Sequence, residues 1–114
     1  MPDPAPKMDQ DGIASALKDL PEWSEVGEAI QRTYQFPDFM TAMAFVSKVA
    51  EHAERVQHHP DIMIRYNKVT LTYSTHDSGG ITAKDFDAAH HADQAAGPPA
   101  PHAPATSKAA RKKK

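Results

Sequence analysis

The sequence predicts an α+β domain, with one four-stranded antiparallel sheet and helices packed on one of its faces, in the order α-β-β-α-β-β-α. Three observations predict it. Helical periodicity occurs in three separate segments, period-two alternation occurs between them, and successive strands are connected by only a few residues. Such short connections favour antiparallel hairpins, and the apolar face of the resulting sheet needs a helical layer to cover it.

The first helix is expected within residues 9–20, where apolar residues recur at helical spacing: Ile13, Leu17 and Leu20. Pro21 ends it, because proline lacks the backbone N–H that would continue a helix. Two strands follow at residues 23–26 and 29–36, joined by a Gly-Glu hairpin turn. Arg32 falls on the apolar face of the second strand, and the pattern gives no reason for it.

The longest helix is expected from Asp38, a favourable N-cap residue, to Val56. An apolar stripe runs along it: Phe39, Ala42, Met43, Val46, Val49, Ala50, Ala53 and Val56. A continuous stripe of this kind is typical of a helix that packs against a sheet.

Two more strands are expected at residues 61–66 and 68–75, followed by a last helix from residue 81 to about 94. Thr82 is its expected N-cap, and Asp85, three residues later, completes a capping box.

The folded domain is expected to span residues 9–96, between disordered segments at 1–8 and 97–114. The C-terminal segment combines prolines and alanines with a basic end, and it buries too little apolar surface to become ordered. All fifteen acidic residues precede residue 97, whereas five of the thirteen basic residues follow it. The acidic domain therefore argues against a nucleic-acid-binding face.

The chain contains no cysteine, which excludes disulfides, thiolate catalysis and cysteine-based zinc sites. Its N-terminus has no apolar run, and no stretch approaches the roughly 18 apolar residues of a membrane span. We therefore expect a cytoplasmic protein with no membrane segment.

The segment Glu-Arg-Val-Gln-His-His-Pro at residues 54–60 is the most informative motif. Glu54 precedes His58 by four residues, so one helical turn would bring its carboxylate to that imidazole. Pro60 makes His59 extended, which places the two histidines where a helix gives way to a strand. The same segment is also compatible with a helix that simply ends in two exposed histidines.

His76 follows His59 by seventeen residues, on a strand face that otherwise carries hydroxyl groups. That face is either solvent-exposed or part of a polar pocket. A metal site is a competing interpretation of the seven histidines. Adjacent histidines splay apart along an extended chain, and no His-x-x-x-His pair occurs, so we expect no metal.

Together these motifs resemble the signature of the pterin-4a-carbinolamine dehydratases. The resemblance rests on the segments at 54–60, 66–69, 74–76 and 80–82 and on Asp85, and it extends from about residue 20 to 94. It implies a dehydratase that converts 4a-hydroxytetrahydrobiopterin (pterin-4a-carbinolamine) to quinonoid dihydropterin during tetrahydrobiopterin recycling. It also implies no cofactor and a homodimer or homotetramer.

The resemblance implies that His58 and His76 are the general acid and base, in an order left open. His59 would bind and orient the pterin ring and share in proton transfer. Each of the three can carry a proton near neutral pH.

The resemblance also implies substrate-binding residues. Asp85 would bind substrate or set the charge of a histidine. Glu54 would support His58 by contacting its imidazole without touching the substrate itself. Trp23 would either form a wall against the flat ring or anchor the core. Pro60 belongs to the same binding segment.

A protein-binding role is the alternative hypothesis. Animal relatives also act as dimerisation cofactors of a homeodomain transcription factor, and some bacterial relatives with degraded active sites serve as RuBisCO assembly factors. A pure scaffold has no physical reason to keep three histidines, and all three are present here. The sequence therefore favours the enzyme, with a small pterin as its partner.

Overall fold

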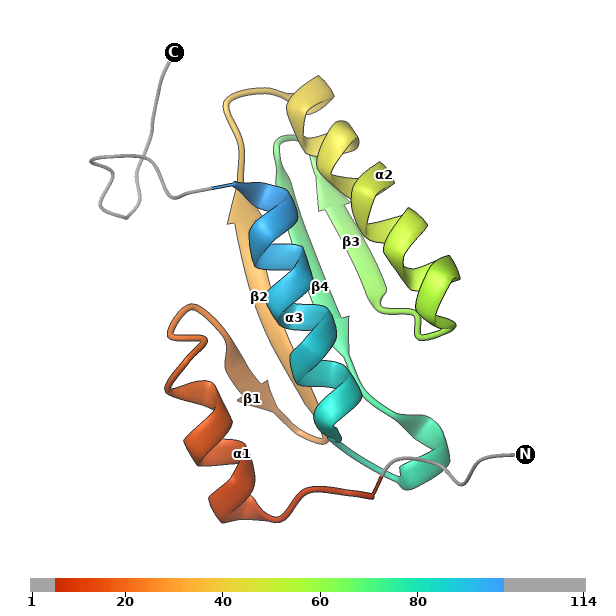
Figure 1. Cartoon of the computed structure of the whole chain (residues 1–114). Helices are drawn as coiled ribbons and strands as arrows, with labels where there is room; N and C mark the ends of the chain where they lie inside the picture. The colour runs from red at the N-terminus through yellow and green to blue at the C-terminus, as the bar shows by residue number, and fades with distance from the viewer. Residues whose placement is uncertain (1–5, 98–114) are drawn as a thin grey trace.

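The computed structural model of the chain describes residues 6–97 (Figure 1). The elements are α1 (Gln10–Leu17), β1 (Ser24–Val26), β2 (Ala29–Gln35), α2 (Phe39–Val56), β3 (Asp61–Arg65), β4 (Lys68–Tyr73), the short 3-10 helix η1 (His76–Ser78) and α3 (Ala83–Ala96). The predicted α+β class is confirmed. The disorder expected for residues 1–5 and 98–114 falls outside the described residues.

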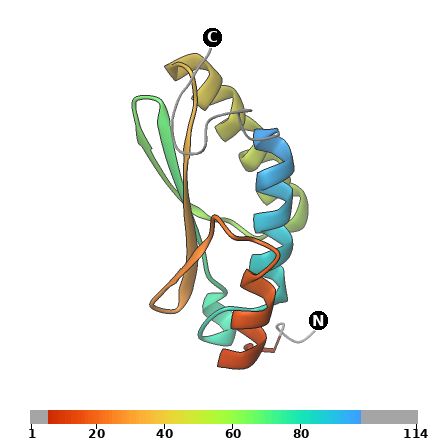
Figure 2. The same cartoon turned by 90° about the vertical axis from the view of Figure 1, so that its left-hand side faces the viewer.

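The four strands form one antiparallel sheet in the order β1-β2-β4-β3. All three α-helices lie on one side of it, and the other side is left without a helical cover (Figure 2). In the register, Ile30 of β2 pairs with Tyr73 of β4, and Leu71 of β4 pairs with Ile62 of β3. Directly paired residues share a face, so the uncovered face carries the alternate residues, including Thr72.

The core lies between the sheet and the helices. Its largest fully buried sheet residues are Ile30, Val69, Leu71 and Tyr73. The helices contribute Phe45 and Val49 of α2, together with Phe86 and several alanines of α3. Burying a large apolar side chain is worth roughly 1.5–3 kcal/mol, so this layer holds the helices on the sheet.

The buried face of α2 differs from the predicted stripe. Phe39 and Val56 were expected in the core, but their side chains are 43% and 49% exposed. Phe45, outside the stripe, is buried at 2%. The reason is that α3 covers the middle of the sheet and α2 lies beside α3 (Figure 1). The buried side of α2 therefore faces both α3 and the sheet.

Arg32 finds its partner on α3. Its guanidinium nitrogen lies 2.8 Å from Oδ1 of Asp93, and its carbon lies 4.1 Å from the centre of the Tyr34 ring. The same Oδ1 accepts hydrogen bonds from Nε1 of Trp23, at 3.1 Å, and from the Tyr34 hydroxyl. Burial, followed by this bond to Asp93, raises the pKa of Tyr34 above its usual range.

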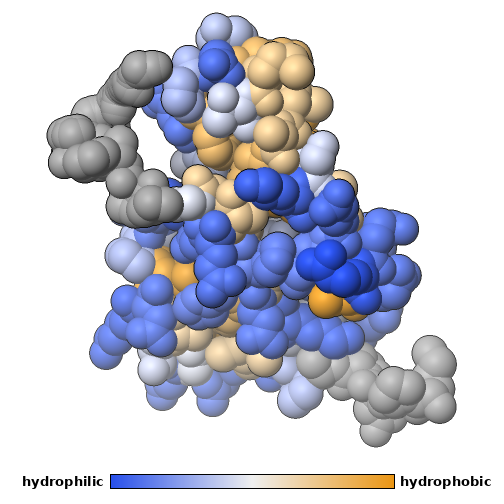
Figure 3. Space-filling view, turned by 45° about the horizontal axis from the view of Figure 1, so that its top comes forward, coloured by the Kyte–Doolittle hydropathy of each residue, from blue (hydrophilic) through white to orange (hydrophobic). Residues whose placement is uncertain are grey.

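Some apolar side chains remain exposed at the N-terminal end of α2. Phe39 is 43% and Met40 is 73% exposed, and the Phe39 ring stacks on Tyr66. Figure 3 shows an apolar area at this end of the molecule, beside a surface that is largely polar. Within residues 6–97, no helix is both long and apolar enough to cross a membrane.

Candidate active site

The two adjacent histidines leave the end of α2 in different directions. Gln57 adopts a left-handed conformation, with φ 55° and ψ 45°, and its N–H donates to the carbonyl of Ala53. The N–H of His58 donates to the same carbonyl at 3.1 Å. This turn ends the helix and sends the chain through Pro60 into β3.

His58 points inward to Asp85. Its Nε2 lies 2.6 Å from Oδ1 of Asp85, and the two side chains are 12% and 0% exposed. The other carboxylate oxygen of Asp85 accepts from the Thr75 hydroxyl and from the N–H of Thr82, both at 2.9 Å. The predicted capping box of α3 is thereby confirmed, and the buried carboxylate has three partners.

Tyr73 lies beside this pair. Its ring is roughly parallel to the His58 imidazole, with ring centres 6.1 Å apart and an angle of 19° between the planes. Burial, and then the charge of Asp85, raises the pKa of Tyr73 to about 12. The phenol therefore stays neutral under ordinary conditions.

His59 points the other way, to Glu54. Its Nε2 lies 2.6 Å from Oε2 of Glu54, and both side chains are more than half exposed. The expectation that Glu54 supports His58 is wrong, because the carboxylate contacts His59 instead. The left-handed Gln57 ends the helix before His58, so the one-turn spacing that would pair Glu54 with His58 does not apply.

A pocket of about 430 Å³ lies at one end of the uncovered sheet face. It is lined by Glu28, Ala29, His59, Asp61, Thr72, Ser74, His76, Gly79 and Gly80. The volume falls within the range of sites for small organic ligands. The fold thus brings His59 and His76 into one cavity with two carboxylates and two hydroxyls.

Backbone and side-chain bonds hold the rim of the pocket. Thr75 and Gly80 exchange backbone hydrogen bonds of 2.9 and 3.3 Å across η1. The Ser74 hydroxyl donates to the carbonyl of Glu28 at 2.7 Å. Gly79 has φ 74°, a conformation that residues with a Cβ rarely adopt.

Residues before α1 also contact this rim. The N–H of Met8 donates to the carbonyl of Ile81 at 2.8 Å, although residues 1–8 were expected to be disordered. A Cβ placed on Gly80 would lie 3.0 Å from Cε of Lys7, so the lysine stem packs against this glycine.

The pocket lining contains two of the residues named from the sequence, His59 and His76. His58 and Asp85 are not among these lining residues and are bonded to each other instead. Trp23 is 4% exposed and packs against two tyrosines. Of the two positions that the sequence allowed for it, pocket wall or core anchor, it occupies the core. Among residues 6–97, no group of three or more histidine, cysteine or acidic side chains could hold a metal ion.

Sequence reasoning missed the carboxylates of Glu28 and Asp61. Side chains alternate between the two sides of an extended chain, and Asp61 lies two residues after His59. The sequence therefore held a signal that Asp61 points to the same side as His59. No local signal existed for Glu28, since it reaches the pocket from the β1–β2 turn, far from the motifs in sequence.

Comparison with known proteins identifies the family. The sequence profile described as pterin 4 alpha carbinolamine dehydratase matches residues 6–95. The chain belongs to the pterin-4a-carbinolamine dehydratase family. A relative from Cyanothece sp., provisionally named pterin-4-alpha-carbinolamine dehydratase, is 56% identical over 77 residues, which is 68% of this chain and 79% of that protein. One from Nocardia farcinica, named in the same way, is 52% identical over 84 residues, or 74% and 88% of the two chains.

Solved structures agree with the dehydratase family fold. A transcriptional coactivator/pterin dehydratase from Brucella melitensis superposes with a TM-score of 0.78 at 35% identity, covering 80% of this chain and 99% of that one. A pterin dehydratase-like protein described as a RuBisCO assembly factor in the alpha-carboxysome gives a TM-score of 0.59 at 23% identity, covering 67% and 90%. The second likeness shows the fold alone.

Proposed function

We propose that this chain is a 4a-hydroxytetrahydrobiopterin dehydratase that works in tetrahydrobiopterin recycling without a metal or organic cofactor. The observation that carries the proposal is that His59 and His76, seventeen residues apart, line one pocket of about 430 Å³. Family membership makes a pterin the natural occupant of that pocket.

The reaction needs one acid and one base. The C4a–O bond breaks as an acid protonates the departing hydroxyl, which leaves as water. A base removes the proton from N5, and the electron pair of that N–H bond forms the new C=N bond to C4a. Two imidazoles in opposite protonation states supply both groups, and the acid and base are restored when the proton on one is passed back through solvent.

The geometry favours His59 and His76 for these proton transfers. Both line the pocket, whereas His58 is bonded to the buried Asp85. Glu54 engages Nε2 of His59, so Nδ1 is the ring nitrogen left for the substrate. The proposal therefore pairs His59 with His76 and makes His58 a positioning residue, whereas the sequence alone paired His58 with His76.

The remaining residues act through these two. Asp85 holds His58 and the start of α3, and thereby the turn that carries His59 and Pro60. Glu54 fixes the orientation of the His59 ring. Substrate binding by Asp85 or Trp23 is not part of the proposal, because both side chains are buried away from the pocket.

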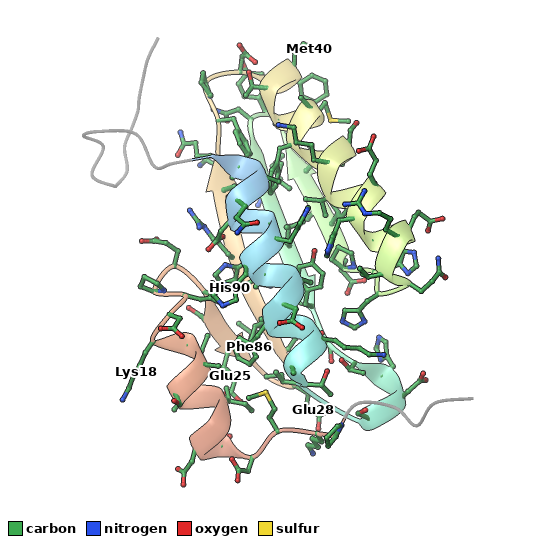
Figure 4. The ribbon with its side chains drawn as sticks, viewed as in Figure 1. Lys18, Glu25, Glu28, Met40, Phe86 and His90 are labelled. Atoms are coloured by element: carbon green, nitrogen blue, oxygen red, sulfur yellow. The ribbon has the colours of Figure 1, made fainter. Side chains whose placement is uncertain are left out.

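A stopped-flow ultraviolet assay of 4a-hydroxytetrahydrobiopterin dehydration, with a chelator present, tests the proposed activity. Wild-type protein should accelerate the reaction well above its spontaneous rate, and the chelator should change nothing. His90→Ala serves as the control variant, since His90 is exposed on α3 and is not part of the pocket lining (Figure 4). If folded wild-type protein gives no acceleration, the proposed dehydratase activity is contradicted, and the protein-binding role becomes the remaining hypothesis.

A further inference from the structure

The pocket contains a carboxylate beside His59 that the proton transfers do not use. Asp61 is the first residue of β3 and pairs with Thr72 of β4, and both side chains line the pocket. His59 and Asp61 are separated only by Pro60, on chain that is entering a strand. Residues two apart on extended chain point to the same side, about 6–7 Å from one another.

Asp61 is held more rigidly than the other pocket carboxylate. Its backbone is in the sheet ladder, and the hydroxyl of its partner Thr72 accepts from Nε2 of Gln31 at 3.0 Å. Glu28 has a longer side chain and lies on the turn between β1 and β2, at the lower end of the sheet in Figure 4. A short side chain on a strand is better suited to fix the orientation of a flat ring.

The pyrimidine edge of a pterin matches a carboxylate. The ring N3–H and the 2-amino group present two parallel donors, and a carboxylate offers two acceptors at the same spacing. The 2-position lies across the pyrimidine ring from C4a. A ring held by this edge at Asp61 therefore points C4a away from that carboxylate and into the pocket that His59 and His76 also line.

We propose that Asp61 binds the N3–H and 2-amino edge of the substrate, and thereby selects 2-aminopteridines over pteridines that carry a 2-oxo group. The inference rests on the proposed function, because it takes a pterin as the occupant of the pocket. It adds a specificity-determining residue that the sequence motifs do not mark.

Binding measurements on two ring systems test the assignment. The probes are 7,8-dihydropterin and 7,8-dihydrolumazine, which carries a 2-oxo group in place of the amino group, titrated against protein by calorimetry. Wild type should prefer the pterin. Asp61→Asn should change the ratio of the two dissociation constants by about tenfold or more towards the lumazine, because a carboxamide offers one acceptor to N3–H and one donor to the 2-oxo group.

Glu28→Gln is the matched control, since it neutralises the other carboxylate of the same pocket. It should leave the ratio of dissociation constants at the wild-type value. An unchanged ratio in Asp61→Asn, a shift that appears in Glu28→Gln instead, or a wild type that binds neither ring would overturn the assignment. Asp61 is exposed, so its substitution should leave the fold intact, and circular dichroism checks this.

The outcome is separable from that of the dehydration assay. A wild type that discriminates between the rings through Asp61 but does not accelerate dehydration contradicts the proposed activity and supports the assignment. A wild type that accelerates dehydration, with a ratio that Asp61→Asn leaves unchanged, supports the activity and overturns the assignment.

Discussion

The imidazole Nε2 of His58 lies 2.6 Å from Oδ1 of Asp85, and the two side chains are only 12% and 0% exposed. This pair ties the connection after α2 to the first turn of α3. It also means that the two histidines of the His-His-Pro motif have different surroundings: His58 is joined to the buried layer, and His59 faces the pocket.

Asp85→Ala should lower the free energy of unfolding by about 3 kcal/mol, since it leaves His58, the Thr75 hydroxyl and the Thr82 N–H without their common acceptor. Urea unfolding followed by circular dichroism measures the loss. Asp87→Ala is the control, because Asp87 is exposed on the same helix. Equal midpoints for the two variants would show that the buried carboxylate does not hold the loop after α2 to the start of α3.

His58→Ala should also be less stable than wild type, by roughly 1–3 kcal/mol, because it removes one partner of a buried carboxylate. His76→Ala should leave the unfolding midpoint nearly unchanged, as His76 is exposed. Indistinguishable urea midpoints for the two alanine variants would contradict this difference.

Asp93→Ala should destabilise the protein by about 2 kcal/mol, because one carboxylate oxygen accepts from Trp23, Arg32 and Tyr34. The chain has a single tryptophan, so its fluorescence reports directly on this cluster. Asp93→Asn keeps one oxygen acceptor and should therefore lose less stability than Asp93→Ala. If the two substitutions cost the same, the shared oxygen does not organise the cluster.

Stability should fall as the pH drops below neutrality, partly through His52. The rings of His52 and His91 stack with centres 3.7 Å apart between α2 and α3. Burial first, and then the charges of His91 and Arg55, lower the pKa of His52 below its ordinary value of 6.5. The unfolded chain therefore binds a proton near pH 6.5 that the folded chain binds only at lower pH, so acidification through this window favours unfolding.

His52→Gln should consequently lose less stability than wild type between pH 7.5 and 5.5. Thermal unfolding at a series of pH values measures the difference. The matched control is His90→Gln, a histidine exposed on α3, which should keep the wild-type pH dependence. Parallel curves for His52→Gln and wild type would contradict the account of this stacked pair.

Local chemistry made much of the fold predictable. The Thr82-to-Asp85 spacing predicts a capping box because both groups act within one helical turn, and the structure has it. The helix that begins after Asp38 was found for the same reason, since the Asp38 side chain accepts from the N–H of Thr41.

Features that depend on an unusual backbone conformation, or on partners distant in the sequence, were not predictable. Glu54 contacts His59 because Gln57 is left-handed, and a glutamine gives no signal of that conformation, as a glycine would. The ion-pair partner of Arg32 is Asp93, which lies sixty-one residues away in the sequence. The pocket itself requires the strand order β1-β2-β4-β3, which alternation along single strands does not specify.

The most direct test of the account compares turnover of His59→Ala, His76→Ala and His58→Ala in the chelator-treated dehydration assay. If His59 and His76 carry the proton transfers, each of their variants should lose about 10²–10⁴-fold in turnover while unfolding like wild type. His58→Ala should lose less turnover and more stability. Near-normal turnover in folded His59→Ala, with the largest loss in His58→Ala, would contradict the central claim that the two pocket histidines are the acid and the base.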